Sequence, residues 1–269
     1  MSSNEPASRR VRLLLAYDGS HFHGFATNDG VRTVAGSLND ALSTIAQSDI
    51  EVQGAGRTDA GVHAWGQVVS VDLPVDLDLE TLPRRLTKMC APGVVVREAA
   101  PADADFSARF SATWRHYRYL VLNDETPDPF MAATSWHVSQ PLNLPLMQMA
   151  CDPLVGEHDF SSFCRRPKEG EHSLVRRVVS AEWTEQRTEH GARLLRFEIR
   201  ATAFCHQMVR SIVGTLVDVG HGKITPGEIS GILRSRRREA AGQVAPPHGL
   251  CFWAVGYPDD GVGKRGAGA

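Results

Sequence analysis

The chain has 269 residues, of which 42% are hydrophobic and 22% are charged, so it can bury a sizeable core, and disordered chains are excluded as a class. Lys and Arg total 29 against 31 Asp and Glu, so the net charge of -2 gives no global sign of a polyanionic partner. No apolar run reaches the ~20 residues of a membrane helix and residues 1–8 contain no apolar signal segment, so we expect a cytoplasmic protein that does not use a membrane.

The first part of the chain has the pattern of a strand followed by a helix, and then of further strands and one more helix. Val11 to Ala16 is an apolar run apart from Arg12, whereas Val34, Leu38 and Leu42 recur at helical spacing. The predicted strands are 11–16, 50–53, 67–73 and 94–97, and the predicted helices are 33–45 and 79–89. The predicted order is therefore β-α-β-β-α-β.

The same order returns in the second part of the chain. The predicted strands there are 117–122, 178–183, 194–199 and 250–255, and the predicted helices are 144–151 and 206–219. Two split β-α-β units of this kind predict an α+β protein whose halves pair around a cleft. We expect domains at residues 9–105 and 106–257, with a disordered N-terminus at 1–8 and a Gly-rich disordered tail at 258–269.

Basic residues gather locally despite the balanced net charge. The clusters are Arg9, Arg10 and Arg12; Arg84, Arg85 and Lys88; Arg165, Arg166 and Lys168; Arg176 and Arg177; and Arg234, Arg236, Arg237 and Arg238. Such clusters are either phosphate contacts or ordinary solvated surface.

Five widely spaced cysteines without a C-x-x-C pair predict reduced thiols and no disulfides. His206 stands beside Cys205, but the spacing of zinc ligands is missing, so we predict a buried thiol and no metal.

The most unusual segment is the loop Gly54–Ala64, which we call the signature loop. Three glycines within eight residues allow tight backbone turns and close approach of a ligand. Asp59 lies within this loop, and an aspartate in such a turn either bonds its own backbone or performs chemistry. Spacing alone leaves both interpretations open.

The stretch Gly56-Arg57-Thr58-Asp59-Ala60-Gly61-Val62-His63-Ala64 resembles the signature of the bacterial tRNA pseudouridine synthase A family. Further segments resemble that family in the same order and together span nearly the whole chain. These segments are Tyr17–Ser20 with Gly24, Phe110–Thr113 with Arg115–Tyr119, Gly156–Phe160 and Phe204–Gly214. The resemblance implies the pseudouridine synthase fold, with two related halves and mixed or antiparallel sheets flanking a central active-site cleft.

The resemblance also implies an isomerase that converts uridine to pseudouridine, with Asp59 as its catalytic residue. The glycosidic bond to nitrogen breaks, the uracil turns, and the sugar is rejoined through a ring carbon. A carboxylate serves either as nucleophile at the anomeric carbon or in deprotonating the ribose to a glycal-like intermediate, and both routes stay open. No cofactor is expected, because nothing is oxidised and no group enters from outside.

Three further residues receive substrate-binding roles from the resemblance. Arg210 is expected to keep Asp59 charged and oriented, although an arginine at a helix flank can also reach out to solvent. Tyr117 is expected to contact the flipped target base, with a plain core tyrosine as the alternative. Arg57 is expected to occupy the place that the flipped base leaves, with a phosphate contact as the alternative.

The family further implies a homodimer that acts on positions 38 to 40 in the anticodon arm of tRNA. Two segments depart from the family pattern, Phe25–Asn28 after Gly24 and Thr87–Pro92, and both bear on how the tRNA is gripped. Two rival functions stay open at this point. An aspartic protease would need Asp-Thr-Gly or Asp-Ser-Gly, which neither Asp18 nor Asp59 provides, and a non-catalytic RNA-binding protein would not need the set of Asp59, Tyr117 and Arg210.

Overall fold

The computed structural model describes residues 7–165 and 173–258 and divides the chain into two compact units. Unit 1 comprises residues 1–113 and 252–269, and unit 2 comprises residues 114–251. The predicted disordered ends lie almost entirely outside the described residues, at 1–6 and 259–269. These units are defined by contacts in space, whereas the expected domains were drawn along the sequence with a boundary at residue 105. The two divisions differ because most of the last strand belongs to unit 1.

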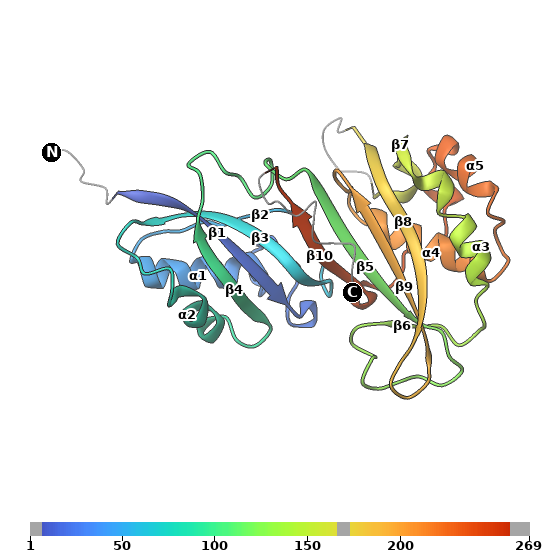
Figure 1. The fold of residues 1–269 in the computed structure, drawn as a ribbon, viewed down its shortest axis with the longest axis horizontal. Helices are drawn as coiled ribbons and strands as arrows, with labels where there is room; N and C mark the ends of the chain where they lie inside the picture. The colour runs from blue at the N-terminus through green and yellow to red at the C-terminus, as the bar shows by residue number, and fades with distance from the viewer. Residues whose placement is uncertain (1–6, 166–172, 259–269) are drawn as a thin grey trace. The chain divides into compact units, whose positions relative to one another are not determined.

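Unit 1 is an antiparallel sheet with two helices. Its elements are β1 (Ser8–Tyr17), α1 (Val34–Ala46), β2 (Gln53–Gly54), β3 (His63–Pro74), α2 (Leu82–Met89), β4 (Val94–Pro101) and the greater part of β10 (Leu250–Gly256). The strands lie in the order β4-β1-β3-β10, and β2 pairs with β3 (Figure 1). The first predicted β-α-β-β-α-β unit is thus present in the predicted order.

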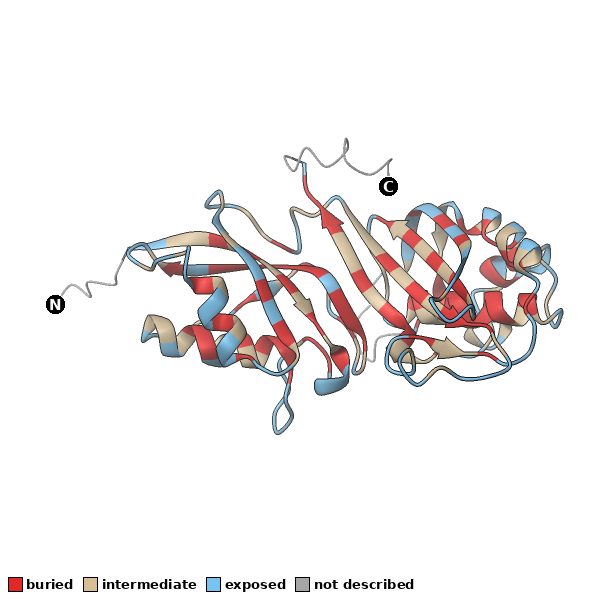
Figure 2. Cartoon of the chain, turned by 60° about the horizontal axis from the view of Figure 1, so that its bottom comes forward, coloured by how far each residue is buried: buried red, intermediate tan, exposed pale blue. Residues whose placement is uncertain are grey.

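The core of unit 1 lies between its sheet and the helices α1 and α2, which lie side by side (Figure 1). Val11, Leu13 and Leu15 of β1 are fully buried and alternate with partly exposed residues, which produces the banding of the strands in Figure 2. Thr33 caps α1 by accepting a hydrogen bond from the Gly36 amide at 3.2 Å. Leu38 then enters the core without exposed surface.

The strands of unit 2 lie in the order β5-β9-β8-β7, and its described residues include the helices α3, α4 and α5 (Figure 1). Its elements are β5 (Trp114–Leu122), β6 (Trp136–His137), α3 (Leu144–Met149), β7 (Gly156–Asp159), β8 (Val175–Arg187), β9 (Arg193–Ala201), α4 (Met208–Gly220) and α5 (Glu228–Ser235). Helix α4 is buried on most of its surface, because its sequence is apolar nearly all round. The α+β class predicted from the sequence is confirmed.

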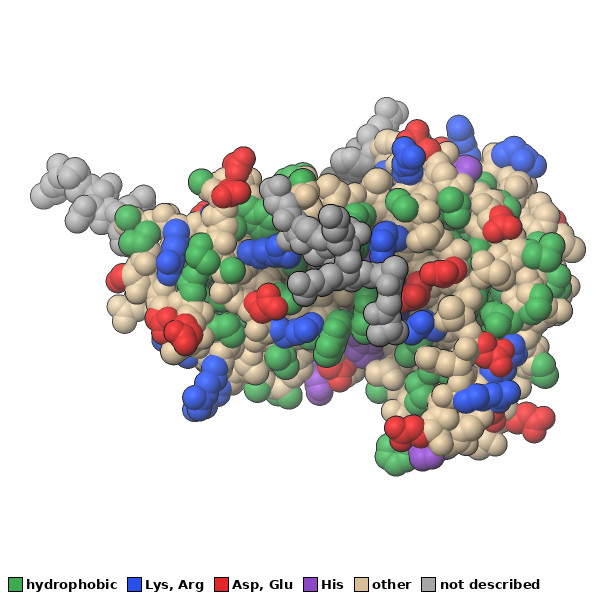
Figure 3. Space-filling view, in the orientation of Figure 1, with side chains coloured by type: hydrophobic (Ala, Val, Ile, Leu, Met, Phe, Trp, Pro, Cys, Tyr) green, Lys and Arg blue, Asp and Glu red, His purple; other side chains and the backbone are tan. Residues whose placement is uncertain are grey.

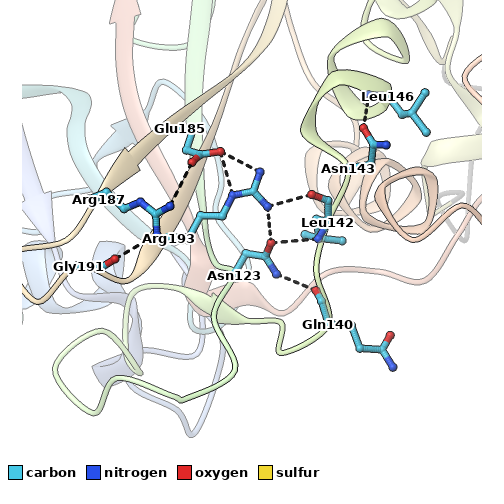
Figure 4. Close-up of polar contacts among 9 residues, drawn as sticks. All are labelled: Asn123, Gln140, Leu142, Asn143, Leu146, Glu185, Arg187, Gly191 and Arg193. Carbon is cyan, nitrogen blue, oxygen red and sulfur yellow. Dashed lines mark hydrogen bonds and ion pairs between the residues drawn. The ribbon is translucent and has the colours of Figure 1, made fainter.

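A buried polar network joins β5, the β8–β9 hairpin and the start of α3 (Figure 4). Asn123 donates to the carbonyls of Val138 and Gln140, both at 2.8 Å, and its Oδ1 accepts from Arg193 at 2.8 Å. Arg193 also pairs with Glu185 at 2.8 Å. Because a buried polar group without a partner costs ~1–3 kcal/mol, this network fixes the path of the connection that leads from β5 to α3.

Several local predictions were wrong or incomplete. The strand expected at 50–53 is only β2, because the Ile50 and Val52 amides donate to side chains of α1, Ser43 Oγ at 2.9 Å and Asn39 Oδ1 at 3.0 Å, instead of to a neighbouring strand. The three short elements β6, β7 and α5 were not predicted. Strands of two to four residues carry too few positions for a periodic pattern.

One face of the sheet in unit 2 carries a charged cluster around Glu198 of β9. Its carboxylate is in contact with Arg118 and lies 3.5 Å from His116 Nε2 on the neighbouring strand β5. The hydrogen bonds from His116 and Arg118 lower the pKa of Glu198 to about 2, despite the opposing effect of burial. The charged form of Glu198 therefore stabilises the folded protein.

We predict that this cluster makes the free energy of unfolding depend on pH in the acidic range. The folded-state pKa of Glu198 lies below the unfolded value, so the stabilisation is present above about pH 4.5 and is lost as the pH falls towards 2. After allowance for solvent screening we expect a loss of about 1–2 kcal/mol in the free energy of unfolding. Denaturant titrations at pH 5 and pH 2.5 should show a smaller fall in the free energy of unfolding for Glu198→Gln than for the wild type. The exposed control Glu157→Gln should show the same fall as the wild type. An equal fall in the free energy of unfolding in all three proteins would contradict the prediction.

Candidate functional site

The signature loop connects β2 to β3 and is held to the sheet by buried polar groups. Gln67 of β3 has no exposed surface and donates from Nε2 to the Gly56 carbonyl at 2.7 Å. The Tyr17 hydroxyl of β1 lies 2.8 Å from Thr58 Oγ1 and 3.4 Å from Gln67 Nε2. Tyr17 and Gln67 thus form a pair of anchors under the loop. The sequence did not reveal this role, because the contacts join residues that are 41 and 50 positions apart.

The segment after β1 packs against the same loop through close backbone contacts. A Cβ atom on Gly19 would lie 2.2 Å from the Val62 carbonyl oxygen, so only glycine fits there. Gly24 has a φ of 101°, and the next residue, Phe25, donates its amide to the Thr58 carbonyl at 3.0 Å. The glycines that resembled the family segment after β1 therefore serve close approach to the signature loop.

These anchors place the loop's charged residues towards solvent. Thr58 is buried with 8% of its surface exposed, whereas Arg57 before it is exposed and Asp59 after it is partly exposed. The backbone turns directly after Asp59, where the Val62 amide donates to the Asp59 carbonyl at 3.1 Å. The loop therefore presents a carboxylate and a guanidinium on either side of a buried, hydrogen-bonded threonine, which suits a group that acts on a bound substrate.

His63 is a further residue of this region that the sequence did not single out for a role. Its side chain is buried, and Nδ1 accepts a hydrogen bond from the Gly19 amide at 3.1 Å. His63 therefore joins the end of the signature loop to the segment that follows β1. We assign it a structural role, because its ring nitrogen is used by the backbone.

In unit 2, Tyr117 and Tyr119 point to the buried face of β5, as alternation predicts. The ring of Tyr117 meets that of Phe204 edge to face, with centroids 4.9 Å apart and planes at 84°. The Tyr119 hydroxyl donates to the Pro246 carbonyl at 2.8 Å, and burial raises the pKa of Tyr119 far above its usual value. Tyr119 thus belongs to the core, whereas Tyr117 retains 7% of its surface at the edge of this aromatic group.

Arg210 lies in the first turn of α4, and its side chain is held by a backbone carbonyl. Its Nε donates to the Ala245 carbonyl at 2.7 Å, and the Ala245 amide donates to the Arg210 carbonyl at 3.1 Å. The positive charge of Arg210 acts on Tyr119, so both residues belong to one region of unit 2. The side chain is therefore fixed at Nε rather than extended freely into solvent. Its pairing with Asp59, which lies in unit 1, stays a prediction.

In two of the five basic clusters, one arginine is paired with a carboxylate within the described residues. Arg10 binds Asp72 through two hydrogen bonds of 2.7 and 2.9 Å, and Arg236 lies 3.1 Å from Asp159. On the face shown in Figure 3, Lys and Arg side chains are interspersed with Asp and Glu. Residues 166 and 168 of the third cluster lie outside the described residues.

Neither a metal cluster nor a membrane span is found in the part of the chain that the structure describes. No group of three or more His, Cys, Asp or Glu side chains there is arranged to hold a metal ion. No helix there is long and apolar enough to cross a membrane.

Comparison with known proteins places these features in one family. The family model described as tRNA pseudouridine synthase matches residues 14–111 and 150–258. The tRNA pseudouridine synthase A of Bacillus subtilis (strain 168) is 41% identical over 250 residues, which cover 92% of this chain and 99% of that protein. The protein of the same name from Halalkalibacterium halodurans is 42% identical over 243 residues, or 90% of each chain. A solved Cbf5-Nop10-Gar1 complex, with 13% identity over 77% of this chain and 54% of that chain and a TM-score of 0.29, is too remote to add to the argument.

We predict that the close packing at Gly19 supports the signature loop. In Gly19→Ala the new methyl group overlaps the Val62 carbonyl, so the loop has to move, and the free energy of unfolding should fall by about 1–3 kcal/mol. Thermal or denaturant unfolding measures this change. The matched control is Gly227→Ala, where a Cβ atom meets open space, and it should stay within about 0.5 kcal/mol of the wild type. Equal stability of the two variants would show that the loop does not depend on this contact.

Proposed function

Because the chain belongs to the tRNA pseudouridine synthase family, we propose that it isomerises uridine to pseudouridine at positions 38 to 40 in the anticodon arm of tRNA. The observation that carries the proposal is the exposure pattern of the signature loop. Arg57 and Asp59 face outwards on a loop that Tyr17 and Gln67 hold rigidly from beneath. We further propose a cytoplasmic enzyme that acts as a homodimer and needs no cofactor.

In this mechanism Asp59 is the catalytic carboxylate. It either attacks the anomeric carbon as the bond to N1 breaks, or helps to remove a ribose proton and so produces a glycal-like intermediate. In both routes the uracil turns and is rejoined through C5, while the C5 proton is lost and N1 gains a proton. The anchored loop supports this role, because a carboxylate that is positioned before substrate binds needs little reorganisation.

The remaining site residues bind the substrate. Tyr117 contacts the flipped base through the small part of its ring that stays exposed beside Phe204. Arg57 is exposed and occupies the gap that the flipped base leaves in the stem. Arg210 provides a positive charge for Asp59, and its bond to Ala245 fixes the orientation of its guanidinium.

The activity is tested by mapping pseudouridine in tRNA that has been treated with the purified protein. We predict that Asp59→Asn lowers turnover by at least about 10³-fold and leaves tRNA affinity within a few-fold of wild type, because the carboxylate performs chemistry rather than docking. The control is Asp29→Asn, which changes an exposed aspartate outside the signature loop and should keep wild-type turnover. Turnover of a tenth or more in Asp59→Asn would exclude Asp59 as the catalytic residue. Pseudouridine formed only outside the anticodon arm would exclude the proposed target.

We predict a graded effect at Arg210. Arg210→Lys keeps the charge but loses the planar fork, so its turnover should lie between the wild type and Arg210→Met, which should lose about 10²-fold or more.

The control for Arg210 is Arg187→Met, which removes an exposed arginine of unit 2 outside the basic clusters and should leave the rate unchanged. Circular dichroism establishes whether Arg210→Met is folded. A folded Arg210→Met variant with wild-type rate would show that Arg210 does not act on Asp59.

The homodimer is tested separately by light scattering of the purified protein over a range of concentrations. A mass of two chains supports the proposal, and a mass of one chain throughout would contradict it. This measurement is independent of the assignment of Asp59.

A further inference from the structure

Two cysteines that are far apart in the sequence meet in unit 2. Cys164 and Cys205 interact through their side chains, and each shifts the pKa of the other. The backbone joins the same two segments one residue further on, where the Arg165 amide donates to the His206 carbonyl at 3.1 Å. Cys164 follows a short helical turn at Ser161–Phe163, and Cys205 precedes α4. The contact is therefore supported by the backbone next to it and does not rest on the two sulfur atoms alone.

The two thiols differ in their access to solvent. Cys164 has only 1% of its surface exposed, whereas Cys205 is partly exposed. The hydrogen bond from Cys164 lowers the pKa of Cys205, and the charge of Arg176 acts in the same direction, against burial and the charge of Asp159. The pKa of Cys164 is raised in turn, by its hydrogen bond to Cys205 and by burial. One accessible, thiolate-prone sulfur with a second sulfur directly behind it is the arrangement of redox-sensitive cysteine pairs.

We propose that Cys205 and Cys164 form a peroxide-sensitive thiol pair that closes reversibly to a disulfide. The Cys205 thiolate attacks one oxygen of hydrogen peroxide, the O–O bond breaks, and the departing hydroxide takes up a proton, which leaves a sulfenic acid on Cys205. The Cys164 sulfur then attacks the Cys205 sulfur, and the sulfenic hydroxyl leaves with the Cys164 proton as water. Two thiols are oxidised to one disulfide, and one peroxide is reduced to two waters.

Closing this disulfide displaces residues next to the proposed base-binding tyrosine. An S–S bond is about 2.05 Å long, which is shorter than any contact between two thiols, so the segments that carry Cys164 and Cys205 have to move closer together. Phe204 immediately precedes Cys205 and supports the ring of Tyr117. We therefore expect oxidation to lower turnover by about tenfold or more, because small misplacements of a binding group have effects of this size. This consequence for turnover rests on the proposed role of Tyr117, whereas the thiol chemistry does not.

The primary experiment maps thiols in the full-length wild-type protein. Hydrogen peroxide should remove two of the five titratable thiols, and dithiothreitol should restore both. Digestion with trypsin and a glutamate-specific protease separates Cys151 from Cys164 at Glu157, so mass spectrometry can identify a Cys164–Cys205 cross-link. A different cross-link, or five unchanged thiols, would overturn the proposal.

Single substitutions then separate the two roles. In Cys164→Ser the sulfenic acid on Cys205 should persist and react with dimedone, whereas Cys205→Ser should lose no thiols and should keep its turnover in peroxide. The matched control is Cys251→Ser, which removes another partly exposed thiol and should behave as wild type. Absence of the dimedone adduct in folded Cys164→Ser would overturn the assignment of Cys205 as the attacking thiol. A mapped disulfide with unchanged turnover would overturn the link to Tyr117 and leave the thiol pair established.

Discussion

The signature loop depends on one buried polar contact, between Thr58 and the pair formed by Tyr17 and Gln67. A buried hydroxyl or amide without a partner costs ~1–3 kcal/mol, so these groups have a strong preference for the arrangement in which all of them are paired. In that arrangement Thr58 points inwards. On either side of it, Arg57 is exposed and Asp59 is partly exposed.

In unit 2, the side chains proposed to bind substrate are held by aromatic packing and by the short segment that contains Ala245 and Pro246. The carbonyl of Ala245 holds Arg210, and the carbonyl of the next residue, Pro246, holds the Tyr119 hydroxyl. Two side chains from different elements are therefore fixed by adjacent peptide groups, so a shift of α4 relative to β5 would break both bonds. Tyr117 lies two residues from Tyr119 on the same face of β5 and is positioned by that same constraint. The rigidity of the proposed binding surface thus follows from core packing.

Patterns with many repeats predicted the fold well, and patterns that depend on tertiary contacts did not. The apolar run in β1 and the helical spacing in α1 were sufficient, because each element carries several apolar residues that enter the core. Residues 50–53 have the composition of a strand, but their amides are bound by side chains of α1, which no local pattern can show. For the same reason Asp59 could be singled out from a contiguous motif, whereas Tyr17, Gln67 and the partners Cys164 and Cys205 could not.

Phe25, where the chain departs from the family pattern, packs beneath the signature loop. Phe25 is buried, and a Cβ atom on Gly54 would lie 2.4 Å from its ring, so the aromatic ring and the glycine at the start of the signature loop fit only together. Its amide also holds the Thr58 carbonyl, a bond that does not depend on the side chain. The backbone at this position therefore supports the loop whatever ring lies there, while the ring fills the space beneath it. A change of residue at Phe25 can thus alter the packing under the loop and still leave Asp59 in place.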